Sequence, residues 1–336
     1  MALKRRREKG EVKFLRQLFA IEKKPQRGLL PIDWVVLVYT AFTLVLMAVM
    51  WTRLINPVSM LMCRLQALAI LVALYGVYRM IPCRLTHLAR IGCQLGMLGL
   101  WYPDTYEFNR LLPNLDHLFA RAEQSLFGFQ PALTFADSWS HPVISELLSL
   151  GYVSYYPLIA LVMLYYFIQR YDEFNRAAFT IMASFFLFYV VFIFLPVAGP
   201  QFYYEAVGLD QIAQGVFPDI GHYFEHHQES LPIPGWKEGF FHDMVVEAHD
   251  AGERPTAAFP SSHVGVTVVL LWLAWRARSR RLFWLMMPFA VLMFFATFYI
   301  QAHYAIDAIA GVVAGTLIYF LCQLLYLPFT RSGRHN

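Results

Sequence analysis

The sequence predicts an all-α fold, a polytopic bundle of about eight transmembrane helices. Its composition is the first indication, because 58% of the 336 residues are hydrophobic and only 15% are charged. Soluble domains have about 45–50% apolar and about 25% charged residues. The second indication is a series of apolar runs long enough to cross a bilayer. The third is the position of Lys and Arg, which gather in an amino-terminal arm and in short linkers between the runs.

Eight apolar runs are the candidate membrane spans. They cover residues 34–51, 65–80, 88–102, 144–168, 177–197, 262–275, 282–300 and 304–327. Gln94 interrupts the third of them. Glycines four residues apart favour close helix packing, and they occur as Gly92 and Gly96 in the third run and as Gly311 and Gly315 in the eighth.

The basic residues predict the orientation. With the amino terminus in the cytoplasm, eight crossings leave five segments on the cytoplasmic side: residues 1–33, 80–87, 169–176, 276–281 and 328–336. Each carries Lys or Arg, as the positive-inside rule requires, and omitting the third span would break this agreement. We therefore expect both termini in the cytoplasm and the arm 1–33 as a retained segment rather than a cleaved signal.

Two connections are unusual. Residues 103–144 mix acids with Leu, Phe and Trp, and we expect short amphipathic helices along the membrane surface there. Segment 200–259 is far longer than ordinary connections and is expected to be an extracytoplasmic lid or binding element. His222 and His226 within it have i, i+4 spacing. Because no third ligand stands at a diagnostic offset, no metal site is predicted.

Two short motifs stand where apolar runs begin. Phe259 to His263 reads Phe-Pro-Ser-Ser-His, and His303 to Asp307 reads His-Tyr-Ala-Ile-Asp. If the chain crosses through the sixth run and returns through the seventh, both motifs lie on the extracytoplasmic side. His303 and Asp307, four residues apart, share one helix face. The Asp307 carboxylate can accept the Nδ1 proton of His303, which leaves Nε2 as a nucleophile.

Ser261 and Ser262 predict the start of a helix, because Pro and Ser before an apolar run are helix-start signals. The first turn of that helix presents backbone N–H groups and the positive end of the helix dipole, which suit a bound phosphate. Together, His263, His303 and Asp307 are the parts that phosphoryl transfer requires.

These motifs resemble the second and third signature motifs of the type 2 phosphatidic acid phosphatase superfamily of membrane enzymes. The resemblance covers about residues 86–327, which would form the six-helix catalytic core of that family. The basic arm and two extra spans would then occupy residues 1–85, and residues 328–336 would be a cytoplasmic tail.

The resemblance also implies roles for individual residues. His303 would attack phosphorus to form a phosphohistidine, Asp307 would orient it, and His263 would protonate the departing alkoxide and then act as base for the acceptor. Ser262, with Ser261 beside it, would hold the phosphate. Neither a metal nor another cofactor is implied.

The chain departs from the phosphatase pattern in two places. Ala296 and Thr297 stand where the family has Ser-Arg before the third motif, and the first motif, a Lys six residues before Arg-Pro, is absent. The Pro-rich segment Leu195–Tyr204 is similar to one in the inositol phosphorylceramide synthase branch, and sphingomyelin synthases share the His-Tyr-x-Ile-Asp form. That likeness implies transfer of a phospho-headgroup between lipids, with Gln201 as a candidate substrate contact.

Another cation must then neutralise the phosphate. Arg254 is the preferred residue because it lies only a few positions before Pro260, and its alternative role is that of a solvated loop arginine.

The predicted function is therefore transfer from a lipid phosphate donor to a lipid or water acceptor at the extracytoplasmic face of a membrane. A lipid phosphate phosphatase is the enzymatic alternative, and a transporter with a His/Asp proton relay is the alternative from another class. A noncatalytic scaffold would not need both histidines and the aspartate. The sequence has no basic stripe with interleaved aromatic residues, so no nucleic acid partner is expected.

Overall fold

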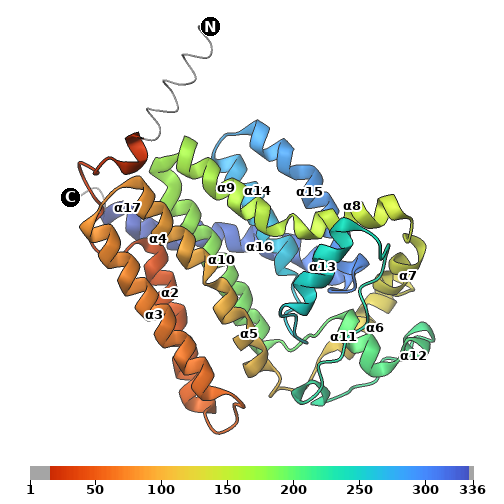
Figure 1. Ribbon diagram of the computed structural model, residues 1–336. Coiled ribbons are helices and arrows are strands. Elements are labelled where there is room, and N and C mark those ends of the chain that lie inside the picture. The colour runs from red at the N-terminus through yellow and green to blue at the C-terminus, as the bar shows by residue number, and fades with distance from the viewer. Residues whose placement is uncertain (1–15, 333–336) are drawn as a thin grey trace, which may run out of the picture. The chain divides into compact units, whose positions relative to one another are not determined.

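A computed structural model describes residues 16–332, which form helices without any strand (Figure 1). The helices are α2 (Pro31–Met50), α3 (Pro57–Met80), α4 (Arg84–Gly96), α5 (Leu98–Asn109), α6 (Asp116–Phe127), α7 (Pro131–Ser138), α8 (Pro142–Val153), α9 (Tyr155–Gln169), α10 (Phe174–Phe194), α11 (Pro200–Val207), α12 (Leu209–Ala213), α13 (Phe240–Asp250), α14 (Ser262–Arg276), α15 (Arg280–Tyr299), α16 (Ala305–Leu325) and α17 (Leu327–Ser332). Two single turns of 3-10 helix are η1 (Tyr171–Glu173) and η2 (Tyr223–Glu225). The predicted all-α fold is confirmed.

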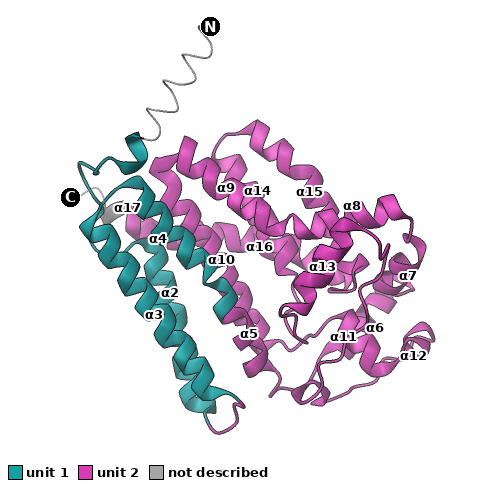
Figure 2. Cartoon of the chain, viewed as in Figure 1, with its two compact units in different colours: residues 1–51, 56–100 teal, residues 52–55, 101–336 magenta. Residues whose placement is uncertain are grey.

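The chain divides into two compact units (Figure 2). Among the described residues, unit 1 holds residues 16–51 and 56–100, and unit 2 holds residues 52–55 and 101–332. Within unit 1, Asp33 lies in the first turn of α2 and accepts hydrogen bonds from the Leu30 N–H at 2.6 Å and the Gln94 amide at 2.8 Å. The Arg90 guanidinium pairs with the same carboxylate. A buried acid is thus balanced inside this unit by one cation and two neutral donors.

Five described helices are long and apolar enough to cross a membrane. They are α2, α3, α10 (with η1), α15 and α16 (with its carboxyl-terminal extension). The pair α8 and α9 makes a sixth if it is one span bent by 48°. Helix α14 is apolar but shorter. The third predicted span is divided between α4 and α5, which meet at Met97. The protein is therefore an integral membrane protein, and the count of eight spans stays a prediction.

Helices α14 and α16 pack most closely in unit 2 because glycines line their contact. A Cβ on Gly315 would lie 2.2 Å from the Gly265 carbonyl oxygen, and one on Gly311 would lie 2.7 Å from the Ser261 oxygen. The backbones therefore touch directly, as the Gly311–Gly315 spacing predicted. This contact lies just inside the two motifs and sets the distance between them.

Segment 200–259 contains the short helices α11, α12 and α13 rather than a membrane span. In Figure 1, α11 and α12 gather with α6 and α7 at one end of unit 2. Helix α13 packs against α8, where the Glu146 carboxylate accepts from the backbone N–H groups of Phe241 at 3.1 Å and His242 at 3.0 Å. The long loop is thus an ordered layer attached to the helical bundle.

Candidate active site

His303 and His263 meet at the start of α16 and α14. His303 Nε2 lies 3.4 Å from His263 Nδ1, and the two rings are nearly perpendicular, with centroids 5.6 Å apart. Ser261 caps α14 through its hydroxyl, which accepts from the Val264 N–H at 3.4 Å, and α14 begins at Ser262. Glycine-mediated packing of the two helices thus brings together histidines forty residues apart in the chain, as the motifs predicted.

The His303 ring is held by a backbone carbonyl. Its Nδ1–H donates to the oxygen of Ala258 at 2.7 Å, whereas the Asp307 Oδ2 atom lies 3.9 Å from Nδ1, beyond hydrogen-bond distance. From the sequence, Asp307 was expected to accept this proton. A proton on Nδ1 leaves the Nε2 lone pair directed at His263, so the predicted tautomer is present with a different acceptor.

Asp307 acts instead on the backbone around both motifs. Its Oδ2 atom accepts from the Tyr304 N–H at 2.7 Å, inside the first turn of α16. Its own carbonyl accepts from the Ser261 N–H at 3.0 Å, which ties α16 to the start of α14. Asp307 is fully buried, and its Oδ1 atom has no hydrogen-bond partner in the described residues.

His263 contacts two aromatic rings. The rings of Tyr152 and Tyr155 each have their centroid 4.6 Å from the imidazole, and both tyrosines are buried. Tyr155 and Tyr152 belong to the bent pair α8 and α9, so the bend turns two aromatic side chains toward the site. The Ser262 side chain is 9% exposed beside them.

The electrostatic environment of His303 keeps its ring neutral. Burial lowers its pKa to about 4, although the hydrogen bond to the Ala258 carbonyl acts in the opposite direction. A neutral ring with a free lone pair on Nε2 is the form that can attack phosphorus.

The Pro-rich turn also reaches the site. Gly199 has a φ of +97°, and a Cβ there would lie 2.5 Å from the Ala302 carbonyl oxygen, so only glycine fits beside the turn that carries His303. The next residues begin α11, where the backbone N–H of buried Gln201 donates to the Gln301 oxygen at 2.9 Å. Gln201 is therefore bound by its backbone to Gln301, which precedes His303 by two residues.

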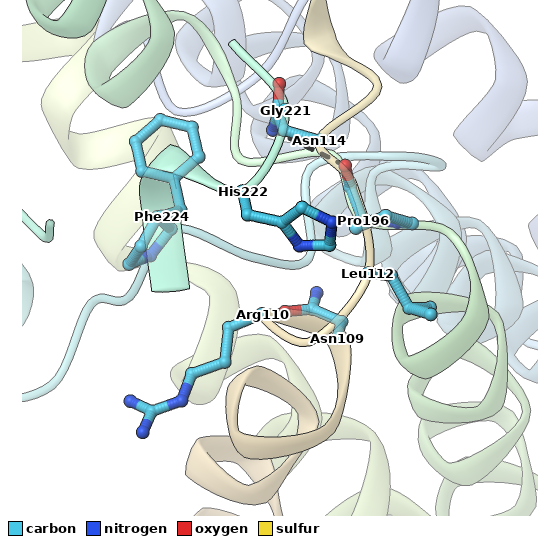
Figure 3. A pocket seen from close by; sticks show the side chains of 9 residues that line it. Asn109, Arg110, Leu112, Asn114, Pro196, Gly221, His222 and Phe224 are labelled. Atoms are coloured by element: carbon cyan, nitrogen blue, oxygen red, sulfur yellow. Dashed lines mark hydrogen bonds between the residues drawn. The ribbon is translucent and has the colours of Figure 1, made fainter. Parts of the chain in front are cut away.

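Arg254 is exposed and donates to the carbonyl of Glu253 at 3.1 Å. Its proposed contact with phosphate stays a prediction. Arg110, an arginine at the end of α5, is 7% exposed and lies 3.5 Å from the Glu107 carboxylate. Figure 3 shows His222 pointing into a small pocket beside Arg110, whose guanidinium turns away from it.

Two acids on α6 also contact the site, and they were not predicted from the sequence. Asp116 and Glu123 are both fully buried and accept hydrogen bonds from groups next to the two motifs. Burial raises the pKa of Asp116 to about 6 and that of Glu123 to about 7. The spacing of seven residues with Ala120 between them was the available signal, because it puts all three on one helix face.

None of these side chains forms a metal site. Within the described residues, no group of three or more His, Cys, Asp or Glu side chains is arranged to hold a metal ion. His222 and His226, whose spacing is typical of metal ligands, belong to no such group. Chemistry without a metal stays a prediction.

The fold and the site together define a class, that of helical membrane proteins with two contacting histidines at the mouths of adjacent helices. Residues 117–321 match a family model described as PAP2 superfamily, and the chain belongs to this superfamily of type 2 phosphatidic acid phosphatases. Membership supports a phosphatase-type membrane enzyme that acts on lipid phosphates. No curated protein matches the chain, and no solved structure matches it.

Proposed function

We propose that the protein transfers a phosphoryl group or phospho-headgroup from a lipid donor to a lipid acceptor, as inositol phosphorylceramide synthases do. The observation that carries this proposal is the contact between His303 Nε2 and His263 Nδ1, with the proton of His303 fixed on Nδ1 by Ala258. This arrangement leaves one nitrogen as a nucleophile and places a proton carrier next to it.

The proposed reaction has two displacements. In the first, His303 Nε2 forms a bond to phosphorus, and the bond from phosphorus to the oxygen of the donor lipid breaks. His263, protonated in the substrate complex, gives its proton to the departing alkoxide. In the second, His263 takes the proton of an acceptor hydroxyl, whose oxygen bonds to phosphorus as the phosphorus–nitrogen bond breaks. Substrate must separate the two imidazoles, because their 3.4 Å contact leaves no room for phosphorus.

Phosphate binding is assigned to the first turn of α14, with Ser262 and Ser261 beside it. Ser261 is fully buried, and its hydroxyl and N–H already contact Val264 and Asp307, so it shapes this turn. Ser262 is the more exposed of the two serines and is the better candidate for direct contact with phosphate. Arg254 and Gln201 complete the proposed substrate contacts.

The alternative within the same chemistry is a phosphatase, in which water replaces the lipid acceptor. The ordered layer formed by α11 and α13 favours transfer, since a covered site excludes water from the phosphohistidine. The proposed catalytic core spans residues 86–327, and the site is proposed to face the extracytoplasmic side, with both termini in the cytoplasm.

The test uses purified protein in mixed micelles with phosphatidic acid, phosphatidylinositol or a polyprenyl diphosphate, each with and without ceramide or diacylglycerol. Free phosphate and new phospholipid are measured together in EDTA. We expect a new phospholipid that forms only with acceptor, and its complete loss in His303→Ala. Free phosphate regardless of acceptor would establish the phosphatase. Absence of both products would favour the transporter.

A further inference from the structure

The inward face of α6 carries two acids, and its outward face carries two exposed leucines together with Arg121. Asp116, Ala120 and Glu123 are fully buried, whereas Leu118 is 51% exposed and Leu126 is 65% exposed. An amphipathic helix of a soluble protein has the opposite arrangement. The two carboxylates therefore turn toward the protein, where their contacts can be followed one by one.

Glu123 binds the first turn of α16. Its Oε1 atom accepts from the Ala305 N–H at 2.6 Å and from the Ile306 N–H at 3.4 Å. These two donors lie in the turn whose N–H groups have no partner within the helix itself. Together with Asp307, which accepts from Tyr304, Glu123 engages three consecutive N–H groups directly after His303.

Asp116 uses both of its oxygens. Oδ2 accepts from the Ala198 N–H at 2.7 Å, and Oδ1 accepts from the Gly199 N–H at 2.8 Å and from the Tyr304 hydroxyl at 3.0 Å. One carboxylate thus joins the Pro-rich turn to the residue that follows His303.

The Pro-rich turn leads back to the ring of His303. The Ala258 N–H donates to the Val197 oxygen at 3.0 Å, next to the two residues that Asp116 binds. Ala258 in turn accepts the His303 Nδ1 proton. Asp116 therefore acts on His303 from both sides, through Tyr304 and through the carbonyl that fixes the tautomer.

We propose that Asp116 and Glu123 are positioning residues that set the orientation and tautomer of the His303 ring, an inference that rests on the nucleophilic role proposed for His303. Neither is ion-paired with Lys or Arg in the described part of the chain, and every partner named above is a neutral N–H or O–H group. Buried carboxylates without a cation are costly. In return, the two carboxylates accept directional hydrogen bonds that hold the backbone around His303 in one conformation.

The test uses the fact that Glu123 accepts hydrogen bonds through one carboxylate oxygen, whereas Asp116 accepts through both. Glu123 uses one oxygen, and its Oε2 atom has no hydrogen-bond partner in the described residues, so Glu123→Gln keeps the needed acceptor. Asp116 uses both, so Asp116→Asn loses one. We expect Glu123→Gln to keep kcat within about fivefold, and Glu123→Leu and Asp116→Asn to lower it at least tenfold with KM nearly unchanged. Glu173→Gln, a carboxylate at the other end of α14, is the matched control.

Two readouts separate positioning from a merely structural role. With radiolabelled donor, the amplitude of phosphohistidine formation counts active sites, and its rate constant reports their geometry. Positioning lowers the rate constant at constant amplitude. A lower amplitude with an unchanged rate constant, or equal rate constants in all four variants, would overturn the inference.

The second readout needs no substrate. In protein labelled with nitrogen-15 histidine, His303 is assigned by comparison with His303→Ala, and its spectrum reports which ring nitrogen carries the proton. We expect the Nδ1–H form in wild type and Glu123→Gln, and a mixture in Asp116→Asn and Glu123→Leu. An unchanged tautomer in the last two would refute the positioning role. If the wild type forms no phosphohistidine but the tautomer still becomes a mixture in Asp116→Asn and Glu123→Leu, only the proposed function would be refuted.

Discussion

The carboxylates near the two ends of α14 have opposite kinds of partners. At the site end, Asp116, Glu123 and Asp307 are fully buried and accept from backbone N–H groups. At the other end, the Glu173 carboxylate is 18% exposed and pairs with Arg170 at 2.8 Å and with Arg276 at 2.6 Å. One end has carboxylates without cations, and the other has a carboxylate with two.

The ion pairs of Glu173 attach neighbouring helices to each other, whereas the buried carboxylates at the site align its backbone. A partly exposed ion pair tolerates changes in distance and angle, and it contributes only about 0–1 kcal/mol. A buried carboxylate that accepts two or three N–H groups has few alternative geometries, because each lost hydrogen bond leaves an unsatisfied buried group at a cost of about 1–3 kcal/mol. The end that performs chemistry thus uses the less tolerant arrangement.

The largest expected effect comes from the contact between α14 and α16. Gly315→Val puts side-chain atoms where the Gly265 carbonyl oxygen now lies, 2.2 Å from the added Cβ, so α14 and α16 must separate. We expect activity to fall more than 100-fold and the thermal unfolding midpoint to drop sharply. Gly92→Val, where a Cβ meets nothing within 4 Å, is the control. Equal stability of the two variants would disprove backbone contact as the determinant.

The pH dependence of stability tests the site end alone. The pKa of Glu123 rises from 4.5 to about 7 on folding, so between these pH values the folded chain holds a proton that the unfolded chain has lost. Stability therefore decreases as pH rises from about 4.5 to 7, by on the order of 3 kcal/mol for this group. Glu123→Gln should remove that part of the decrease, measured by thermal unfolding in micelles at pH 5 and pH 8.

The other titratable groups around Glu123 are the reference for that experiment. Asp116, with a pKa raised to about 6 by burial, contributes a decrease of the same sign in both proteins. The prediction therefore concerns the difference between wild type and Glu123→Gln. Parallel pH curves for the two proteins would show that Glu123 titrates as an ordinary surface acid.

A smaller effect is expected from the one cation proposed for the site end. Arg254→Ala should lower turnover at least tenfold if the guanidinium neutralises the phosphoryl oxygens in the transition state. Arg121→Ala, another exposed arginine outside the predicted cytoplasmic segments, is the matched control. Unchanged turnover in Arg254→Ala would remove this residue from the site.

The smallest effect should come from the distal ion pairs. Glu173→Gln keeps the shape of the side chain and removes the charge between Arg170 and Arg276. We expect loss of no more than about 1 kcal/mol of stability and an unchanged kcat. A fall in kcat comparable to that of Glu123→Leu would mean that both ends align the site, and the comparison would fail.

The sequence was a good guide where spacing alone carries the information. His263, His303 and Asp307 were predicted to lie together from their places at the starts of two helices, and Gly311 and Gly315 correctly indicated close packing. The match to the PAP2 superfamily confirms the family that these motifs suggested. The transferase branch within it stays a prediction.

Other features were not predicted. The acceptor of the His303 proton is the backbone carbonyl of Ala258, which any residue type could supply. Helix α6 lies in segment 103–144, which was expected to form amphipathic helices along the membrane surface. In a membrane protein the outside can be apolar, so periodicity gives the faces of a helix without saying which one is inside. The buried face carrying Asp116 and Glu123 was therefore overlooked.

The long separation of Glu123 from its partner has a consequence for synthesis of the chain. Glu123 and Ala305 are 182 residues apart, which at 5–20 residues per second means roughly 10 to 40 s of translation between them. During that interval the Glu123 carboxylate exists without its N–H donors, so it stays in water or keeps its proton. Helix α6 can therefore take its final place only after the ribosome has made α16, and the amino-terminal part of the site is completed by the last long helix.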